Sequence, residues 1–176
     1  QTINFAKSVG IAIASILILF CYIYFHLKIK NIKQRQKILE LKVAKYKLLK
    51  EKKEHKPLDK VAKEEKKVRE SSIYKHLIAA IEEETFHLTE GDWTDIKEVI
   101  NQTYDNFDSN LHGFLDVSPQ EYKICLLLKM GISPTNIAHL VNLSKEAITA
   151  SRRRMYTKAF NKKGKPADWD KIINSL

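Results

Sequence analysis

An uncharged, apolar run near the start of the chain, residues 9–25 (VGIAIASILILFCYIYF), most constrains what the chain can fold into. With one flanking residue before it and two after it, the run makes twenty residues. As a helix these span roughly 30 Å, about the thickness of a hydrocarbon core. A core helix of a soluble protein would keep a polar face, and a signal peptide would end in small residues rather than bulky aromatics. The sequence therefore predicts a transmembrane helix within residues 1–27.

Basic side chains gather directly behind this run. They are Lys28, Lys30, Lys33, Arg35 and Lys37. Only Lys7 precedes the run. Because segments rich in Lys and Arg stay on the cytoplasmic side of a membrane, we expect a single-pass protein whose C-terminal part is cytoplasmic. The chain begins with Gln1 rather than Met, and we therefore expect a longer portion upstream.

Charge divides the chain into four blocks. The formal net charge of +10 is distributed as +1 over residues 1–27, +10 over 28–70, −8 over 71–116 and +7 over 117–176. A field of one sign selects partners of the opposite sign, so the four blocks predict four different parts. The last, basic block is the one that is suited to nucleic acid.

Residues 28–70 contain no Gly and one Pro, Pro57, so a helix is predicted from the apolar run up to that residue. Alternating spacings of three and four mark one face of it, made of Ile29, Ile32, Gln36, Leu39, Val43 and Tyr46. This spacing favours a short parallel coiled coil and hence a homodimer. Because the pattern is short, a single helix with its Lys face on anionic membrane lipid stays open. Residues 56–70 are almost all charged and are predicted to be an extended or loosely helical spacer.

The acidic segment, residues 71–116, is predicted to be a helical subdomain. Ser71 and Thr89, the latter with Asp92 behind it, are residues that cap helix N-termini. Helical spacing follows at Ile73, Leu77, Ile78, Ile81 and Phe86, then at Trp93, Ile96, Val99, Ile100 and Tyr104, with a short third turn at Phe107, Leu111 and Phe114. Three consecutive acidic residues are interpreted as a solvated face, with docking on the basic linker as the alternative. These are Glu82, Glu83 and Glu84.

The chain offers no residue pattern for catalysis or for metal binding. Cys21 and Cys125 are far apart and the six histidines stand singly, so neither a disulfide framework nor a zinc site can be drawn. No Gly-rich phosphate loop and no nucleophile motif occurs in the sequence. The sequence predicts a protein that is not an enzyme and that uses no metal or cofactor.

Three helix start signals follow one another in residues 117–176. They are a Ser118-Pro119 cap with Glu121 in a capping box, a Ser133 cap with Pro134 behind it, and a Ser144 cap. Gly131 supplies a left-handed stop for the first helix. The sequence therefore predicts three short helices in close succession.

The connection between the second and third helices, residues 141–143, is very tight. Ala138 is small where two helix backbones approach, Asn142 tolerates a left-handed conformation, and Ile148 faces the core. The predicted core comprises Leu126, Leu127, Ile137, Leu140, Leu143, Ile148 and Met155. This arrangement predicts a helix-turn-helix.

The third helix has an outward face that suits the major groove of DNA. With Ile148, Met155 and Ala159 inward, the residues pointing outward are Glu146, Thr149, Ala150 and Arg153, flanked by Lys145, Arg152 and Arg154. Arg binds guanine bidentately, and Thr or Ala contacts a thymine methyl. Phosphate contacts are predicted for Lys158, Lys162, Lys163 and Lys165. The alternative is a three-helix domain that binds protein, which leaves the charge of this helix unexplained.

Four short stretches of the same segment match the pattern of one family. They are V-S-P at 117–119, G-I-S at 131–133, N-I-A at 136–138 and L-S at 143–144. Through these four stretches, residues 117–160 resemble the LuxR-type (GerE-like) DNA-binding domain. The resemblance implies that this segment binds double-stranded promoter DNA. Asn142 stands where that family prefers Gly, and residues 149–151 (Thr-Ala-Ser) stand where it often has Lys, Asn and His. Base preferences are therefore not carried over.

The tail, with R-R-R-M-Y-T-K at 152–158, Phe160 and Trp169-Asp170, resembles a group of Bacteroides-type membrane-anchored regulators. In that group a periplasmic tetratricopeptide-repeat sensor, one span and a coiled-coil linker precede the DNA-binding domain. The resemblance implies a bacterial inner-membrane location and a sensor upstream of Gln1. We expect an all-α transcriptional regulator. Two alternatives stay open: a sigma-factor-like module that contacts RNA polymerase, and a membrane-tethered protein-interaction adaptor.

A last apolar stripe follows Pro166. Its members are Trp169, Ile172, Ile173 and Leu176, with Asp170, Lys171 and Asn174 expected outside. The spacing predicts a short fourth helix. This helix either covers the core of its own chain or pairs with a second copy, and the LuxR-type resemblance implies the pairing.

Overall fold

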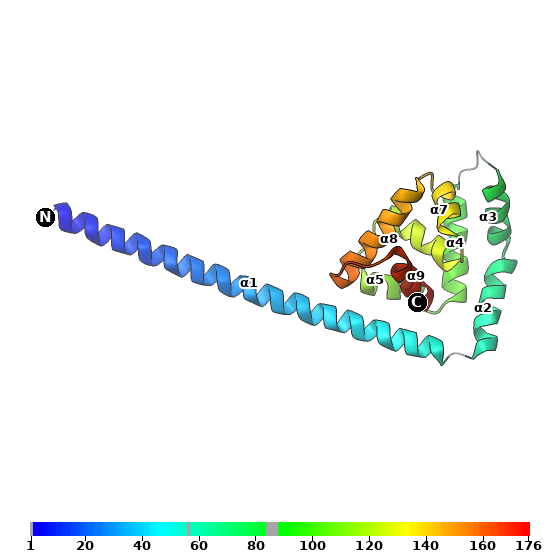
Figure 1. Cartoon of the computed structure of the whole chain (residues 1–176), viewed down its shortest axis with the longest axis horizontal. Helices are drawn as coiled ribbons and strands as arrows, with labels where there is room; N and C mark the ends of the chain where they lie inside the picture. Colours follow the sequence, from blue (N-terminus) through cyan, green and yellow to red (C-terminus); the bar gives the residue numbers. More distant parts are fainter. Residues whose placement is uncertain (1, 56, 84–87) are drawn as a thin grey trace. The chain divides into compact units, whose positions relative to one another are not determined.

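The computed structural model describes residues 2–55, 57–83 and 88–176, with side chains from residue 15 onward. Every regular element in these ranges is a helix, so the all-α prediction is confirmed (Figure 1). The elements are α1 Thr2–Glu54, α2 Leu58–Glu70, α3 Ser72–Glu82, α4 Glu90–Thr103, α5 Phe107–Phe114, α6 Pro119–Lys129, α7 Pro134–Leu140, α8 Lys145–Phe160 and α9 Pro166–Ser175. Glu84 of the acidic triplet and Phe86 of the apolar spacing lie outside the described residues.

Contacts divide the chain into two compact units, residues 1–41 and 42–176. The first consists of most of α1, and its described apolar side chains are exposed except Leu39, which is half-buried; Phe20, for example, is 72% exposed. By length and composition α1 is able to cross a membrane. Its orientation in a membrane stays a prediction.

The second unit begins within α1, at Lys42. Tyr46 lies half-buried in this unit, with its ring 6.2 Å from that of Phe160 of α8. Val43 is half-buried as well. The last two residues of the expected coiled-coil stripe therefore pack within the second unit. The stripe residues in the first unit are Ile29, Ile32, Gln36 and Leu39.

The spacer expected at residues 56–70 is instead a regular helix over most of its length, α2. Its one strongly buried side chain, Val68, is 2% exposed. Lys67 Nζ donates to the carbonyl oxygen of Gln102 in α4 at 3.1 Å. Of the two forms predicted for this spacer, the helical one is therefore observed and the extended one is not, because Val68 and Lys67 dock the otherwise charged helix on its neighbours.

The caps predicted for the acidic segment are present. Ser71 Oγ accepts from the Tyr74 amide at 3.2 Å, and Thr89 forms a capping box with Asp92. The expected third turn is α5, which buries Phe107, Leu111 and Phe114 completely. These three helices belong to the same unit as the last four.

Three capped helices follow, and they pack with α9 and α4 (Figure 1). The hydroxyls of Ser118, Ser133 and Ser144 accept amide hydrogen bonds at 3.1–3.3 Å, as predicted. Gly131 and Asn142 are left-handed, with φ of 82° and 52°. All the predicted core residues are buried except Leu143, which is 38% exposed. Leu143 follows the left-handed Asn142 and leads into the Ser144 cap, outside the regular helices.

The fourth helix predicted for residues 117–176 is α9, and its apolar stripe is buried within its own chain. Trp169 and Ile173 are 0% exposed, and Ile172 is 1% exposed, because α9 lies against α6 and α8. The stripe therefore covers the core of its own chain, and its pairing with a second copy stays a prediction. Asp170, expected outside, is half-buried against α8.

Candidate nucleic-acid interface

α8 packs on the rest of the unit through one face, as the spacing predicts. Ile148 and Met155 are 0% exposed and Ala159 is 2% exposed. The helix begins at its Ser144 cap and ends at Asn161, which is left-handed with φ of 51°. Because the inward residues are fixed, the outward positions of α8 are fixed as well.

Five of the predicted contact residues share the exposed side of α8. Lys145, Glu146, Ala150 and Arg153 are exposed, and Thr149 is half-buried. Arg153 and Ala150 line a shallow depression of about 550 Å³ together with Arg154, Thr157, Lys158 and Asn161. The face thus combines cations with small and hydroxyl side chains, a combination found where helices contact base edges and phosphates.

Arg152 does not belong to this face, which corrects its prediction as a contact residue. Its side chain is 9% exposed, and its Nη1 donates to Asp170 of α9 at 2.6 Å. Burial raises the pKa of Asp170, and the Arg152 charge and hydrogen bond act in the opposite direction. Arg152 is a residue of the α8–α9 interface. It contacts Asp170 because α9 packs against α8.

Arg154 and Lys158 are exposed, but each of them is bound to Glu121 of α6. Arg154 Nε donates to Oε1 at 3.1 Å, and Lys158 Nζ lies 3.4 Å from both carboxylate oxygens. Glu121 is 3% exposed. Burial acts to raise its pKa, but hydrogen bonds from Ser118 and Arg154 and the charge of Lys158 prevail and hold that pKa below its usual value.

Sequence reasoning found Glu121 only as part of the Ser118 capping box. Glu121 does close that box, since Ser118 N donates to Oε2 at 3.1 Å. Its second role depends on a helix that begins 24 residues later in the sequence, and no local pattern reports that. A carboxylate can accept from several donors at once, which allows one side chain to serve both helices.

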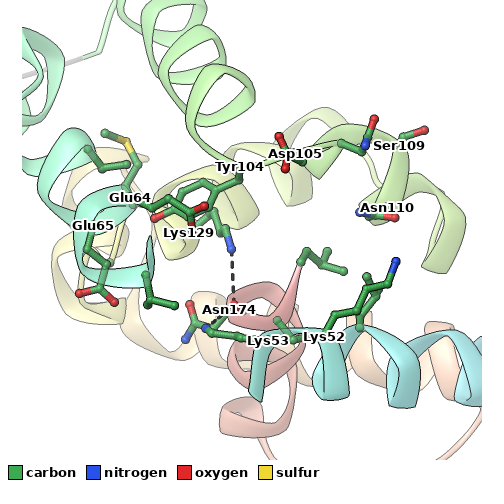
Figure 2. A pocket seen from close by; sticks show the side chains of 18 of the residues that line it. Lys52, Lys53, Glu64, Glu65, Tyr104, Asp105, Ser109, Asn110, Lys129 and Asn174 are labelled. Carbon is green, nitrogen blue, oxygen red and sulfur yellow. Dashed lines mark hydrogen bonds between the residues drawn. The ribbon is translucent and has the colours of Figure 1, made fainter. Parts of the chain in front are cut away.

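A second hollow lies away from α8, where the end of α1 meets α2, the α4–α5 connection and the end of α9. Its volume is about 830 Å³. Lys53 Nζ donates to the carbonyl oxygen of Asn174 at 2.6 Å, and Lys129 reaches the same oxygen at 3.4 Å. Figure 2 shows Lys129 pointing toward Asn174, and its Nζ lies 3.9 Å from the centre of the Tyr104 ring. Cations of α1 and α6 therefore lie at the carboxyl end of α9. This placement is favourable because the carboxyl end of a helix carries the negative end of its dipole.

Tyr104 forms part of the same hollow. Burial raises the pKa of Tyr104 to about 12, and the charges of Glu65 and Glu64 on α2 act in the same direction. The phenol is therefore neutral at physiological pH. Its ring lies beneath the Lys129 ammonium, in a cation–π contact.

The remaining chemistry-bearing groups do not assemble a site in the described part of the chain. No group of three His, Cys, Asp or Glu side chains with metal-binding geometry occurs there. Cys125 is fully buried, and burial raises its pKa to about 12, which disfavours the reactive thiolate. The charged face of α8 is therefore the strongest candidate for function.

Comparison of the chain with protein-family models, with curated proteins and with solved structures gives no match. The proposed function consequently rests on the residues and geometry described above.

Proposed function

We propose that this protein is a membrane-anchored transcriptional regulator that binds promoter DNA through the helix-turn-helix formed by α7 and α8. The observation that carries the proposal is the exposed face of α8, where Lys145, Thr149, Ala150 and Arg153 lie on the side opposite the buried core residues. A capped helix with this face has the chemistry of a major-groove recognition helix. In this proposal a signal reaches the DNA-binding part through α1.

The basic residues beyond α8 add to this proposal. Lys162, Lys163 and Lys165 are exposed and follow the helix directly. Phosphate contacts of this kind position a protein on DNA and carry no sequence information themselves. Base selection is therefore assigned to Arg153 and its small neighbours on α8.

The test is a selection from random duplexes with the whole chain in lipid nanodiscs. The whole chain is needed because α3 contacts α7 and α4 contacts α6, so residues 117–176 do not form a separate unit. We expect a preferred sequence. Failure to recover one at any salt concentration contradicts the proposal, and binding to core RNA polymerase or to another protein instead favours the sigma-factor or adaptor alternative.

Arg153→Ala tests the mechanism on the selected sequence. It should weaken specific binding by about 1 to 3 kcal/mol and relax preference at one base pair, because a bidentate contact to guanine is lost. Lys75→Ala is the matched control, since Lys75 is an exposed cation on α3, outside the helix-turn-helix. If both variants weaken specific and non-specific duplexes to the same degree, α8 does not select bases.

A further inference from the structure

We propose that Glu121 is a positioning residue of the DNA-binding face, which orients Arg154 and Lys158 and keeps part of their charge from pairing with phosphates of non-specific DNA. This inference rests on the proposed function. It assigns to a residue of α6, outside the recognition helix, a share in how that helix distinguishes sequences.

The geometry places one carboxylate beneath two cations of the outward face. Arg154 and Lys158 are one helical turn apart on α8, and both contact the carboxylate of Glu121, whose side chain is buried. Arg154 is additionally fixed by a hydrogen bond from its Nη2 to Ser151 Oγ at 3.1 Å. Both cations retain exposed surface, with side chains 56% and 47% accessible.

Charge competition gives this contact a consequence for DNA binding. Each cation that pairs with a phosphate releases counterions, and this release drives non-specific affinity. A cation that is already bound to a carboxylate must exchange that partner for the phosphate or share itself between them. The binding free energy gained from the phosphate is therefore smaller. Within the described residues Arg153 forms no ion pair with a carboxylate, and it lines the same depression, so its charge is available to a base or a phosphate.

The capping role of Glu121 and its positioning role are separable, because Asp closes the same kind of box elsewhere in the chain. Asp92 does so at α4 with Thr89, and Asp168 accepts from the Lys165 amide at 2.8 Å at α9. In Glu121→Asp the cap with Ser118 should survive. The shorter side chain then recedes from α8 by about 1.5 Å, one carbon–carbon bond, which takes Arg154 and Lys158 beyond hydrogen-bonding distance.

The experiment measures binding of the whole chain in nanodiscs to the selected duplex and to a scrambled duplex over a series of salt concentrations. Glu121→Asp and Glu121→Gln should bind the scrambled duplex several-fold more tightly, with a salt slope steeper by about 0.9 for each phosphate gained. The ratio of specific to non-specific affinity should fall by a similar factor, because the base contact assigned to Arg153 is left in place. Asp92→Asn, which weakens a capping box that touches no α8 cation, should leave both affinities and the slope unchanged.

Each other outcome overturns the inference. If Glu121→Asp matches the unmodified chain in slope and ratio, Glu121 is a helix cap only. If both Glu121 variants lower the two affinities equally at unchanged slope, its role is structural. Should Glu121→Gln lose helical circular dichroism, Glu121→Asp alone decides. Failure of the proposed function has a different signature, since the unmodified chain then prefers no duplex, and the inference fails with it.

Discussion

Arg152, Arg153 and Arg154 are consecutive cations of one helix in three different environments. A helix turns by about 100° per residue, so three neighbours point in three directions. Arg152 points to α9 and Asp170, Arg154 to Glu121, and Arg153 to solvent. A run of like charge is therefore not one functional unit, and the three residues need separate experiments.

Arg152→Ala should destabilise the fold by roughly 3 kcal/mol, because it leaves the half-buried carboxylate of Asp170 without its cation. The loss should shrink as pH falls, since burial already raises the pKa of Asp170 and a protonated carboxyl needs no partner. Urea unfolding of the chain in detergent micelles, followed by circular dichroism at several pH values, measures both effects.

Lys171→Ala is the matched control for that experiment. Lys171 lies on α9, the helix that carries Asp170, and its ion pair with Asp168 at 3.8 Å is largely exposed, so its removal should have almost no effect on stability. An equal loss in both variants, or a loss for Arg152→Ala that does not depend on pH, contradicts the assigned role of the buried pair.

At the scale of elements, local signals predicted where helices begin. The Ser, Thr and Asn residues at the caps and turns of α3, α4, α6, α7 and α8 act on their nearest backbone groups, and those groups are neighbours in sequence. The burial of Arg152 and the two contacts of Glu121 depend on how whole helices pack. No spacing in the sequence encodes that α9 folds onto α8, so the predicted face included one residue that the fold buries.

Trp169→Ala tests the role of α9 in the fold. Trp169 is fully buried, so the cavity should cost about 3 to 5 kcal/mol of unfolding free energy. Leu58→Ala on α2 removes an apolar side chain that is 84% exposed and should change stability little. A fall in self-association with unchanged stability, measured by sedimentation and urea unfolding, contradicts the packing role and favours the dimer contact.

At the scale of the whole molecule, one continuous helix joins an apolar segment to the unit that carries the recognition face. α1 runs from Thr2 to Glu54, and its last part belongs to the second unit, where Tyr46 contacts Phe160 at the end of α8. Lys53 contacts the last turn of α9. The end of α1 therefore contacts α8 and α9. If the proposed function holds, these contacts are a physical route by which a signal entering through α1 reaches the helix proposed to bind DNA.

That route requires the second unit to lie in the cytoplasm, where DNA is. The cations Lys28, Lys30, Lys33, Arg35 and Lys37 behind the apolar run, against Lys7 before it, predict this orientation. A reporter enzyme fused after Leu176 and active only in the cytoplasm should therefore be active in bacterial cells. Replacing those five cations with Gln should lower its activity, because the charge bias that retains this side is removed. The same number of Gln substitutions at exposed lysines further from the run, namely Lys60, Lys63, Lys66, Lys75 and Lys171, should have a smaller effect. Digestion of the C-terminal part by protease added outside intact spheroplasts contradicts the orientation, and DNA binding by α8 would then lack access to its partner.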